Sequence, residues 1–301
     1  MAKSQLFGGI EGGGTKFICI VGSGPDEIVD EVRFATTTPQ ETLHKVCGFF
    51  LPYVREKHLR SIGIGCFGPA DVEPSSPTYG YITTTPKPNW KDTNLLGVLQ
   101  HELGVPIALD MDVAASALGE HTWGASQGLD PSFYLTVGTG IGGTYLLNGK
   151  TLRGLISSEM GHIRIPHDQQ ADPYPGWCPF HGDCFEGLAC GPAIQERFGK
   201  PAENLPDNHP FWDLEADYIA SALVNYILVF SPKKIVLGGG VMHRSFLFPR
   251  IHRRLPALLN GYLNHPLFNS QADEYIVPPA LGYLSGALGG IALAMRLDGD
   301  G

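Results

Sequence analysis

The sequence predicts an α/β protein that is built from two related lobes. Strand-like apolar runs alternate with helix-like segments along most of the 301 residues. A strand, a glycine-rich turn and a return strand occur near residue 6 and again near residue 133. Glycine and proline gather at about 124–131, between the two copies. A repeated unit with such a break between its copies indicates two lobes with a cleft between them.

The expected elements of the first lobe follow from the spacing of apolar residues. Residues 6–10 and 17–21 are the strands of a hairpin, because two apolar runs flank a glycine-rich turn. From Pro39, apolar residues recur at helical spacing. The expected order after the hairpin is a strand at 27–35, a helix at 39–58, a strand at 61–66, a loop at 71–90, a helix at 92–103, a strand at 106–109 and an alanine-rich helix at 113–123.

The second lobe starts with the same hairpin. Residues 133–137 and 144–147 are expected strands around the turn 138–143. The apolar pattern then predicts a helix at about 212–230, a strand at 234–237, a helix at 245–260 and a last, helical segment at 284–297.

Charge and composition exclude several classes of protein. The formal net charge of −9 argues against nucleic-acid binding, which needs a basic face, although backbone amides can still bind an anionic substrate. No apolar run is long enough to span a membrane, so we expect no membrane partner. Six cysteines in a chain of this length do not indicate a disulfide framework, and the cytoplasm is the expected compartment.

Three glycine clusters are candidates for contact with phosphate or nucleotide. Gly12–Gly14 with Thr15 and Lys16 form the first turn, and Gly138–Gly143 with Thr139 form the second. Turns without Cβ atoms let backbone N–H groups approach phosphate oxygens, but ordinary hairpin turns also use glycine. Two turns in matched positions favour a pair of phosphate clamps. The third cluster, Gly238–Gly240, follows a strand; it would let a flat group such as a purine or a sugar lie against the backbone, but on its own it is more typical of a close strand–helix turn.

Asp110 and Asp112 lie between an expected strand and an expected helix. A carboxylate at a helix N-terminus stays ionised, and it can serve either as a helix cap or as a general base toward a hydroxyl group. The spacing alone does not choose between the two residues.

Cysteine and histidine residues between 162 and 184 are typical of a metal site. Cys178, His181 and Cys184 follow one another at intervals of three, and His162 lies sixteen residues upstream. Two thiolates and two imidazoles are a set that tetrahedral zinc prefers, and a complete set indicates a structural ion. His167 competes with His162 as the fourth ligand, and Asp183 is a further oxygen donor. Two carboxylates, Glu159 and Glu186, are interleaved with these residues.

These motifs together resemble the ROK family of sugar kinases and repressors, and most closely its bacterial fructokinase branch. The resemblance covers residues 6 to about 290 and is carried by the segments 11–16, 136–143, 159–162, 178–189 and 237–241 together with Asp112. It implies an actin-like ATPase (ribonuclease H-like) fold with two lobes and a central cleft. The implied lobes are residues 1–115, joined by a C-terminal helix at about 286–301, and residues 116–285 with the zinc loop.

The resemblance also implies an activity, namely transfer of the γ-phosphoryl group of Mg-ATP to a hexose, in first place the 6-hydroxyl of fructose. It assigns Asp112 as the catalytic base and His162, Cys178, His181 and Cys184 as ligands of a structural zinc. The implied sugar contacts are Gly68, Pro69, Glu159 and Glu186. The implied ATP contacts are Gly12, Gly13, Gly14, Thr15, Lys16, Gly138, Thr139, Gly140, Gly238, Gly239 and Gly240.

The chain departs from the family pattern at three positions near the expected sugar and magnesium sites. Glu11 replaces the usual Asp, Met111 replaces the Asn before Asp112, and Ala114 replaces an Asn after it. Mannose, glucose and an N-acylated aminosugar therefore stay open as alternative substrates. A sugar-responsive repressor or sensor is the alternative from another class, disfavoured because the first glycine loop begins at residue 8. The resemblance further implies a homodimer.

Overall fold

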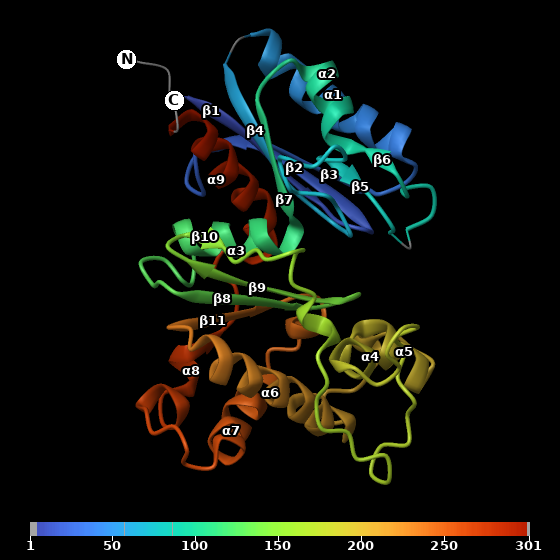
Figure 1. The fold of residues 1–301 in the computed structure, drawn as a ribbon, viewed down its shortest axis with the longest axis vertical. Helices are drawn as coiled ribbons and strands as arrows, with labels where there is room; N and C mark the ends of the chain where they lie inside the picture. Colours follow the sequence, from blue (N-terminus) through green and yellow to red (C-terminus); the bar gives the residue numbers. More distant parts are fainter. Residues whose placement is uncertain (1–4, 57, 86, 300–301) are drawn as a thin grey trace. The chain divides into compact units, whose positions relative to one another are not determined.

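The computed structural model describes residues 5–56, 58–85 and 87–299. Within it the chain divides into two compact units (Figure 1). Unit 1 extends to Gln127 and takes up the chain again at Ala280, and unit 2 is Gly128–Pro279. No helix in the described part of the chain combines the length and the apolar character needed to cross a lipid bilayer.

Unit 1 contains a five-stranded mixed sheet in the order β3-β2-β1-β4-β7. The first three strands are antiparallel neighbours, and β4 and β7 continue the sheet in parallel with β1. The strands are β1 (Leu6–Gly12), β2 (Lys16–Gly22), β3 (Ile28–Ala35), β4 (Leu59–Cys66) and β7 (Ile107–Met111), with a separate short pair β5 (Tyr81–Ile82) and β6 (Thr93–Asn94). The helices are α1 (Pro39–Arg55), α2 (Leu95–Leu103), α3 (Asp112–Trp123) and α9 (Ser285–Gly299), with a 3-10 turn at Gly282–Leu284.

Helices cover both faces of this sheet (Figure 1). Alternate residues of β2 point to opposite faces, so Phe17 and Cys19 pack in the cluster of α1 and α2, whereas Ile18 and Ile20 pack with α9. Apolar residues are present at every one of these positions because both faces are buried.

Unit 2 repeats this topology. Its sheet has the order β10-β9-β8-β11-β12, with β8 and β9 antiparallel and β11 parallel to β8. The strands are β8 (Ser132–Val137), β9 (Ile141–Leu147), β10 (Lys150–Thr151), β11 (Lys234–Gly238) and β12 (Ile276–Val277). The helices are α4 (Phe185–Ala189), α5 (Gly191–Phe198), α6 (Phe211–Phe230), α7 (Leu247–Leu259) and α8 (Ala272–Tyr275), with 3-10 turns at Met160–His162, Ala202–Asn204, Val241–His243 and Pro266–Phe268. The predicted repeat of one α/β unit is therefore confirmed at the level of strand order.

Some predicted boundaries differ from those observed. The helix expected from residue 92 begins at Leu95, because Thr93 and Asn94 form β6 and the Asn94 side chain caps the helix by accepting from the Gly97 N–H (2.9 Å). The sequence pattern did not reveal α4, α5, α8 or β12, which have eight residues at most. Such short elements offer too few turns for a periodic apolar pattern.

Glycine explains how α9 packs so closely on unit 1. A Cβ atom on Gly9 would lie 2.1 Å from the Ala287 carbonyl oxygen, and one on Gly289 would lie 1.7 Å from that of Ala115. The helix therefore contacts both the sheet and α3 through backbone atoms. Residues 116–127 and 280–285, which the resemblance assigns to the second lobe, lie in unit 1.

Candidate active site and metal centre

The four residues of the predicted metal site lie together in unit 2. One side-chain ligand atom from each of His162, Cys178, His181 and Cys184 can be chosen so that all lie within 4.8 Å of one another. His162 ends a 3-10 turn, and Cys184 is the N-cap of α4. His181 is carried by a tight turn in which the Cys178 and Gly182 backbones exchange two hydrogen bonds (3.3 and 2.9 Å).

The distances within this cluster fit a tetrahedral ion. The Cys178 sulfur is 3.7 Å from Nδ1 of both His162 and His181, and the Cys184 sulfur is 3.5 Å from Nδ1 of His162. Zinc bonds of about 2.3 Å to sulfur and about 2.0–2.1 Å to nitrogen put two such ligands about 3.6 Å apart at a tetrahedral angle. The two cysteines are buried, which keeps competing water away. The donor set and its spacing therefore suit a structural metal such as zinc.

His167 is engaged elsewhere, which separates it from the cluster. Its Nδ1 lies 3.2 Å from Asp183 and its Nε2 lies 2.9 Å from the Asp172 carbonyl oxygen. The Asp183 carboxylate also pairs with Arg164, and this environment, mainly the hydrogen bond with His167, lowers its pKa. His167 and Asp183 thus brace the loop instead of completing the metal site.

Glu186 links the metal cluster to the second glycine turn. It lies in the first turn of α4, two residues after Cys184. Its Oε2 accepts a hydrogen bond from the Ile141 N–H (2.8 Å), and its Oε1 is 3.9 Å from Nε2 of His162. A Cβ atom on Gly140 would lie 2.9 Å from the same carboxylate, so glycine makes room for this contact. The carboxylate thus lies near a metal-site histidine and accepts a hydrogen bond from the second glycine-rich hairpin at once.

Glu159 directly precedes the 3-10 turn of His162 and is exposed. The pKa of its carboxyl is raised mainly by desolvation; His162 lowers it, and the charge of Glu186 raises it. Glu159 and Glu186 thus lie close enough for their charges to interact. Two such carboxylates beside the metal cluster can accept hydrogen bonds from a polyhydroxylated ligand.

The second and third glycine clusters lie side by side. A Cβ on Gly138 would approach the Gly240 nitrogen to 3.4 Å, and one on Gly239 would lie 2.3 Å from the Val137 carbonyl oxygen. Gly239 has φ +97°, where other residues are strained. Thr139, at the tip of the second turn, is exposed. The two clusters, about 100 residues apart in the sequence, form one glycine-lined surface.

The first glycine turn is held by a neighbouring strand. The Gly13 N–H donates to the Lys16 carbonyl (2.9 Å), and Thr36 donates through its N–H to Thr15 (2.9 Å) and through its hydroxyl to Gly13 (2.7 Å). No residue of Gly12–Gly14 has the positive φ that would make glycine obligatory. A Cβ on Gly14 would meet nothing within 4 Å, so the tip of this turn is open.

Three carboxylates gather at the carboxyl ends of the unit 1 strands. Glu11 and Asp110 flank Gly65 in one row across β1, β4 and β7, and Asp112 begins α3. Asp110 is buried and accepts from the Met111 N–H (2.8 Å), whereas Asp112 is half-buried and accepts from the Val113 N–H (2.7 Å). Asp112 is thus the more accessible of the two candidate bases.

Glu11 has a strongly perturbed carboxyl. Burial raises its pKa to about 7, with Lys16 opposing this shift and Asp112 adding to it. A Cβ on Gly286 of α9 would lie 2.6 Å from a Glu11 carboxylate oxygen, so α9 closes over this side chain. A carboxyl held half-protonated near neutral pH is ready to ionise when a cation approaches.

Met111 occupies the space beside the predicted sugar residues Gly68 and Pro69. Its terminal methyl would lie 2.4 Å from a Cβ on Gly68. Ala114, the other departure from the family pattern, is buried. An apolar side chain therefore lines this position in place of an amide.

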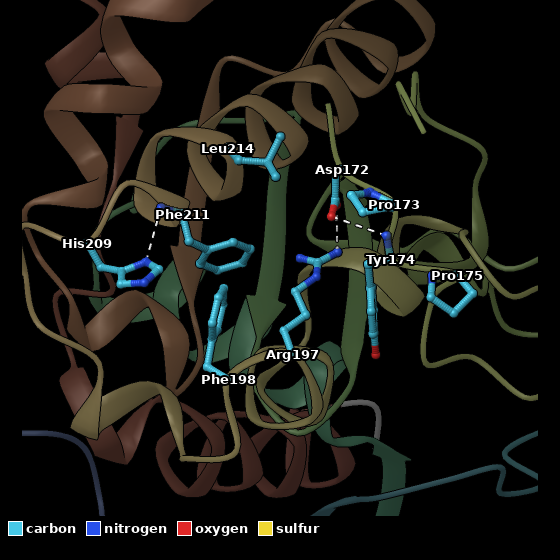
Figure 2. Close-up of a pocket in the computed structure, with 9 residues that line it drawn as sticks. All are labelled: Asp172, Pro173, Tyr174, Pro175, Arg197, Phe198, His209, Phe211 and Leu214. Carbon is cyan, nitrogen blue, oxygen red and sulfur yellow. Dashed lines mark hydrogen bonds and ion pairs between the residues drawn. The ribbon is translucent and has the colours of Figure 1, made fainter. Parts of the chain in front are cut away.

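A separate pocket of unit 2 contains none of the predicted site residues (Figure 2). It has a volume of about 540 Å³ and is lined by Asp172, Pro173, Tyr174, Pro175, Arg197, Phe198, His209, Phe211 and Leu214. Its Asp172 carboxylate already accepts from Arg197 (3.0 Å) and from the Tyr218 hydroxyl (2.6 Å). Most of the remaining lining is apolar or aromatic, so the pocket has no constellation for phosphoryl transfer.

Two polar residues with structural roles in unit 1 were not predicted, namely Thr36, which holds the first turn, and Glu120, a fully buried carboxylate in the last turn of α3 and away from the candidate site. The only signal for Glu120 is a charged residue within an otherwise apolar, alanine-rich segment.

Comparison with known proteins agrees with these features. The model of the ROK family matches residues 7–296. A putative fructokinase of Bacillus subtilis is 46% identical over 96% of this chain and 95% of its own, and a fructokinase of Pediococcus pentosaceus is 42% identical over 96% and 98%. The structure of a ROK hexokinase from Thermus thermophilus superposes with a TM-score of 0.77 and 26% identity, covering 99% of this chain and all of that one. Together with the repeated sheet topology, this confirms the predicted actin-like fold.

Proposed function

This chain belongs to the ROK family, and we propose that it is an ATP-dependent fructokinase that transfers the γ-phosphoryl group to the 6-hydroxyl of D-fructose. Relatives named fructokinase match it over nearly their whole length. The structural observation that carries the proposal is the position of Glu186, which adjoins the metal cluster and binds the second glycine turn. Groups suited to sugar hydroxyls and groups suited to phosphate thus lie side by side in unit 2.

In this proposal Asp112 is the general base. It accepts the proton of the 6-hydroxyl while that oxygen attacks the γ-phosphorus, and the bond from phosphorus to the bridging oxygen breaks to release ADP. Its position at the first residue of α3 favours the ionised form through the helix dipole.

Glu159 and Glu186 orient the sugar by accepting hydrogen bonds from its hydroxyl groups, and Gly68 and Pro69 are further proposed sugar contacts. Thr15, Lys16 and the glycines of the first turn contact the phosphates, as do Thr139 and its neighbouring glycines. Gly238–Gly240 form the nucleotide wall. Mg²⁺ bound to ATP would supply positive charge there, and Glu11 would be the carboxylate of unit 1 that interacts with it.

We assign zinc to the cluster of His162, Cys178, His181 and Cys184, because donor type and spacing suit it. A zinc ion would cross-link the segment of Glu159 to that of Glu186 and so fix both carboxylates. All four ligand positions come from the chain, which makes the role structural.

Sugar binding should promote closure of the two units, because water competes with the sugar for the γ-phosphoryl group.

We also propose a homodimer. Light scattering on the purified protein would test this, because a dimer has twice the mass of one chain.

A panel of hexoses with Mg-ATP tests the proposal. We expect the largest kcat/KM for fructose, measured as ADP formation, with fructose 6-phosphate identified by NMR. A larger value for mannose, glucose or an N-acylated aminosugar would shift the assignment within the kinases. No sugar-dependent ADP formation by the metal-loaded protein would instead support a sensor.

A further inference from the structure

Glu120 is a fully buried carboxylate that takes no part in the proposed chemistry, yet it accepts four hydrogen bonds. Its Oε2 accepts from the N–H groups of Ala125 (2.7 Å) and Ala280 (3.0 Å). Its Oε1 accepts from the Leu281 N–H (3.0 Å) and the Ser285 hydroxyl (2.7 Å). Every partner is a donor, so an ionised carboxylate satisfies all four.

These donors come from the two places where the chain passes between the units. The unit boundaries fall after Gln127 and before Ala280. Ala125 lies just before the first crossing, and Ala280 and Leu281 lie just after the second. One side chain therefore holds both crossings at their unit 1 ends.

The backbone of Glu120 reinforces the first of these attachments. Its carbonyl accepts from the N–H groups of Gly124 (3.0 Å) and Ser126 (3.1 Å). A Cβ on Gly124 would lie 2.1 Å from Oε2 of Glu120, so a larger residue would displace the carboxylate.

Directly after these anchors, the first residue of unit 2 is a glycine with open space around it. A Cβ on Gly128 would meet nothing within 4 Å, and this residue has φ +71°. A backbone conformation that favours glycine therefore follows the anchored residues directly.

The same helix carries Asp112 and Glu120. Asp112 is the first residue of α3 and Glu120 lies in its last turn, about 12 Å away at 1.5 Å per residue. A Cβ on Gly119 would lie 2.5 Å from the Ser285 carbonyl oxygen, so α3 is also locked against the start of α9. Because Asp112 and Glu120 belong to one helix, bonds that fix the crossings to Glu120 also fix their position relative to Asp112, the proposed base.

We propose that Glu120 is a positioning residue: it fastens both crossings between the units to α3. Because α3 also carries Asp112, closure of the units then brings Asp112 to one defined place. The inference rests on the proposed kinase function, in which closure precedes transfer. Glu120 touches neither substrate and acts through the crossings.

The test compares Glu120→Gln with wild type. The NH2 of the Gln amide donates and cannot accept, so the donors that face the oxygen it replaces lose their acceptor, while the remaining oxygen still accepts and side-chain volume is kept. We expect amide exchange of the peptides around 125 and 280–281 to become about tenfold faster or more. We also expect kcat to fall about tenfold, with the KM for fructose changing about threefold at most.

Compaction is measured separately by X-ray scattering with fructose, Mg²⁺ and a non-hydrolysable ATP analogue. Wild type should contract, and Glu120→Gln should contract less. Glu215→Gln is the matched control, because Glu215 is an equally buried carboxylate of unit 2 far in sequence from both crossings. It should retain the wild-type contraction and kcat.

Three results would overturn the inference. One is an unchanged kcat and contraction in Glu120→Gln despite faster exchange, which would mean a structural role only. The second is the same kinetic loss in Glu215→Gln, and the third is a wild type that does not contract. If Glu120→Gln does not fold, Ser285→Ala removes one donor and should shift exchange and kcat in the same direction, about two- to threefold. Absence of kinase activity in wild type would refute the proposed function, whereas the exchange data would still report the anchoring.

Discussion

The two glycine-rich turns occupy equivalent places in the two sheets, but different groups support them. In unit 1, the turn is tied by Thr36, a neutral residue directly after β3. In unit 2, the turn is tied by the carboxylate of Glu186, which belongs to the metal-site segment 45 residues farther along the chain. The Gly191 N–H adds a bond to the Gly138 carbonyl (2.7 Å).

This difference shows how a duplicated unit can take on two tasks. The turn of unit 1 is held by neighbouring segments of its own sheet, and the acids beside it lie at strand ends. The turn of unit 2 depends on a segment that is otherwise organised around the metal cluster. We therefore expect loss of the metal to affect the second turn and to leave the first one intact.

The largest expected effect concerns unit 1. Asp112→Ala should keep the fold and sugar binding but lower kcat by about three to four orders of magnitude, because the attacking hydroxyl loses its base. The steady-state rate of ADP formation at saturating fructose and Mg-ATP measures this kcat. Asp110→Asn is the control, and its kcat should stay within about tenfold of wild type, because Asp110 is buried and accepts a hydrogen bond from the Met111 N–H. The reverse ranking would make Asp110 the base.

The next effect tests the metal dependence of unit 2. Cys184→Ser should abolish stoichiometric zinc, measured by elemental analysis, and should raise the KM for both sugar and ATP, because Glu159 and Glu186 lose their support. Its unfolding midpoint should also fall. A variant with wild-type zinc content would show that Cys184 is not a ligand, and an unchanged KM for ATP would separate the metal from the second turn.

The metal ligands were predictable because they are close together in the sequence, whereas the contact between Glu186 and Ile141 was not. Cysteine and histidine residues spaced three apart are characteristic of a metal site, so Cys178, His181 and Cys184 could be predicted as ligands from the sequence. The hairpins were equally visible, because apolar runs around a glycine turn form within one short segment. The hydrogen bonds of Glu186 with Ile141 and of Glu120 with Ala280 join segments 45 and 160 residues apart, and such distant contacts produce no recognisable pattern in the sequence. For the same reason, the assignment of residues 116–127 to a unit required the packing of α3 on α9.

Glu186→Gln and Thr36→Val form a matched pair across the two turns. Glu186→Gln weakens the anionic acceptor of the Ile141 N–H, and we expect the KM for ATP to rise about tenfold together with that for fructose. A change confined to the KM for fructose would mean that Glu186 serves only the sugar.

Thr36→Val keeps the shape of the side chain and removes one neutral hydrogen bond to Gly13. Its KM for ATP should rise about two- to threefold, with no change in metal content. A larger effect than that of Glu186→Gln would reverse the expected order of the two turns.

The smallest effect concerns the stability of unit 1 and its pH dependence. Burial raises the pKa of Glu11 from 4.5 to about 7, so the folded protein holds a proton that the unfolded chain releases between these values. Below pH 4.5 both states are protonated and Glu11 costs nothing through ionisation. As pH rises from 4.5 to 7, the penalty grows, and above pH 7 it is complete. Glu11→Gln should therefore stabilise the ligand-free protein by up to about 3 kcal/mol at pH 8 relative to pH 4.5.

Urea unfolding of wild type and Glu11→Gln at several pH values measures this difference directly. The gain should shrink toward zero at pH 4.5, and Mg-ATP should reduce it at pH 8, because a cation near the ionised carboxylate offsets its burial in wild type only. A stability difference that is constant with pH would show that Glu11 is ionised throughout. In that case Glu11, at the end of β1, would already be charged before the nucleotide binds. A charged carboxylate would then adjoin both glycine turns, and the two turns would differ less than the contrast between Thr36 and Glu186 suggests.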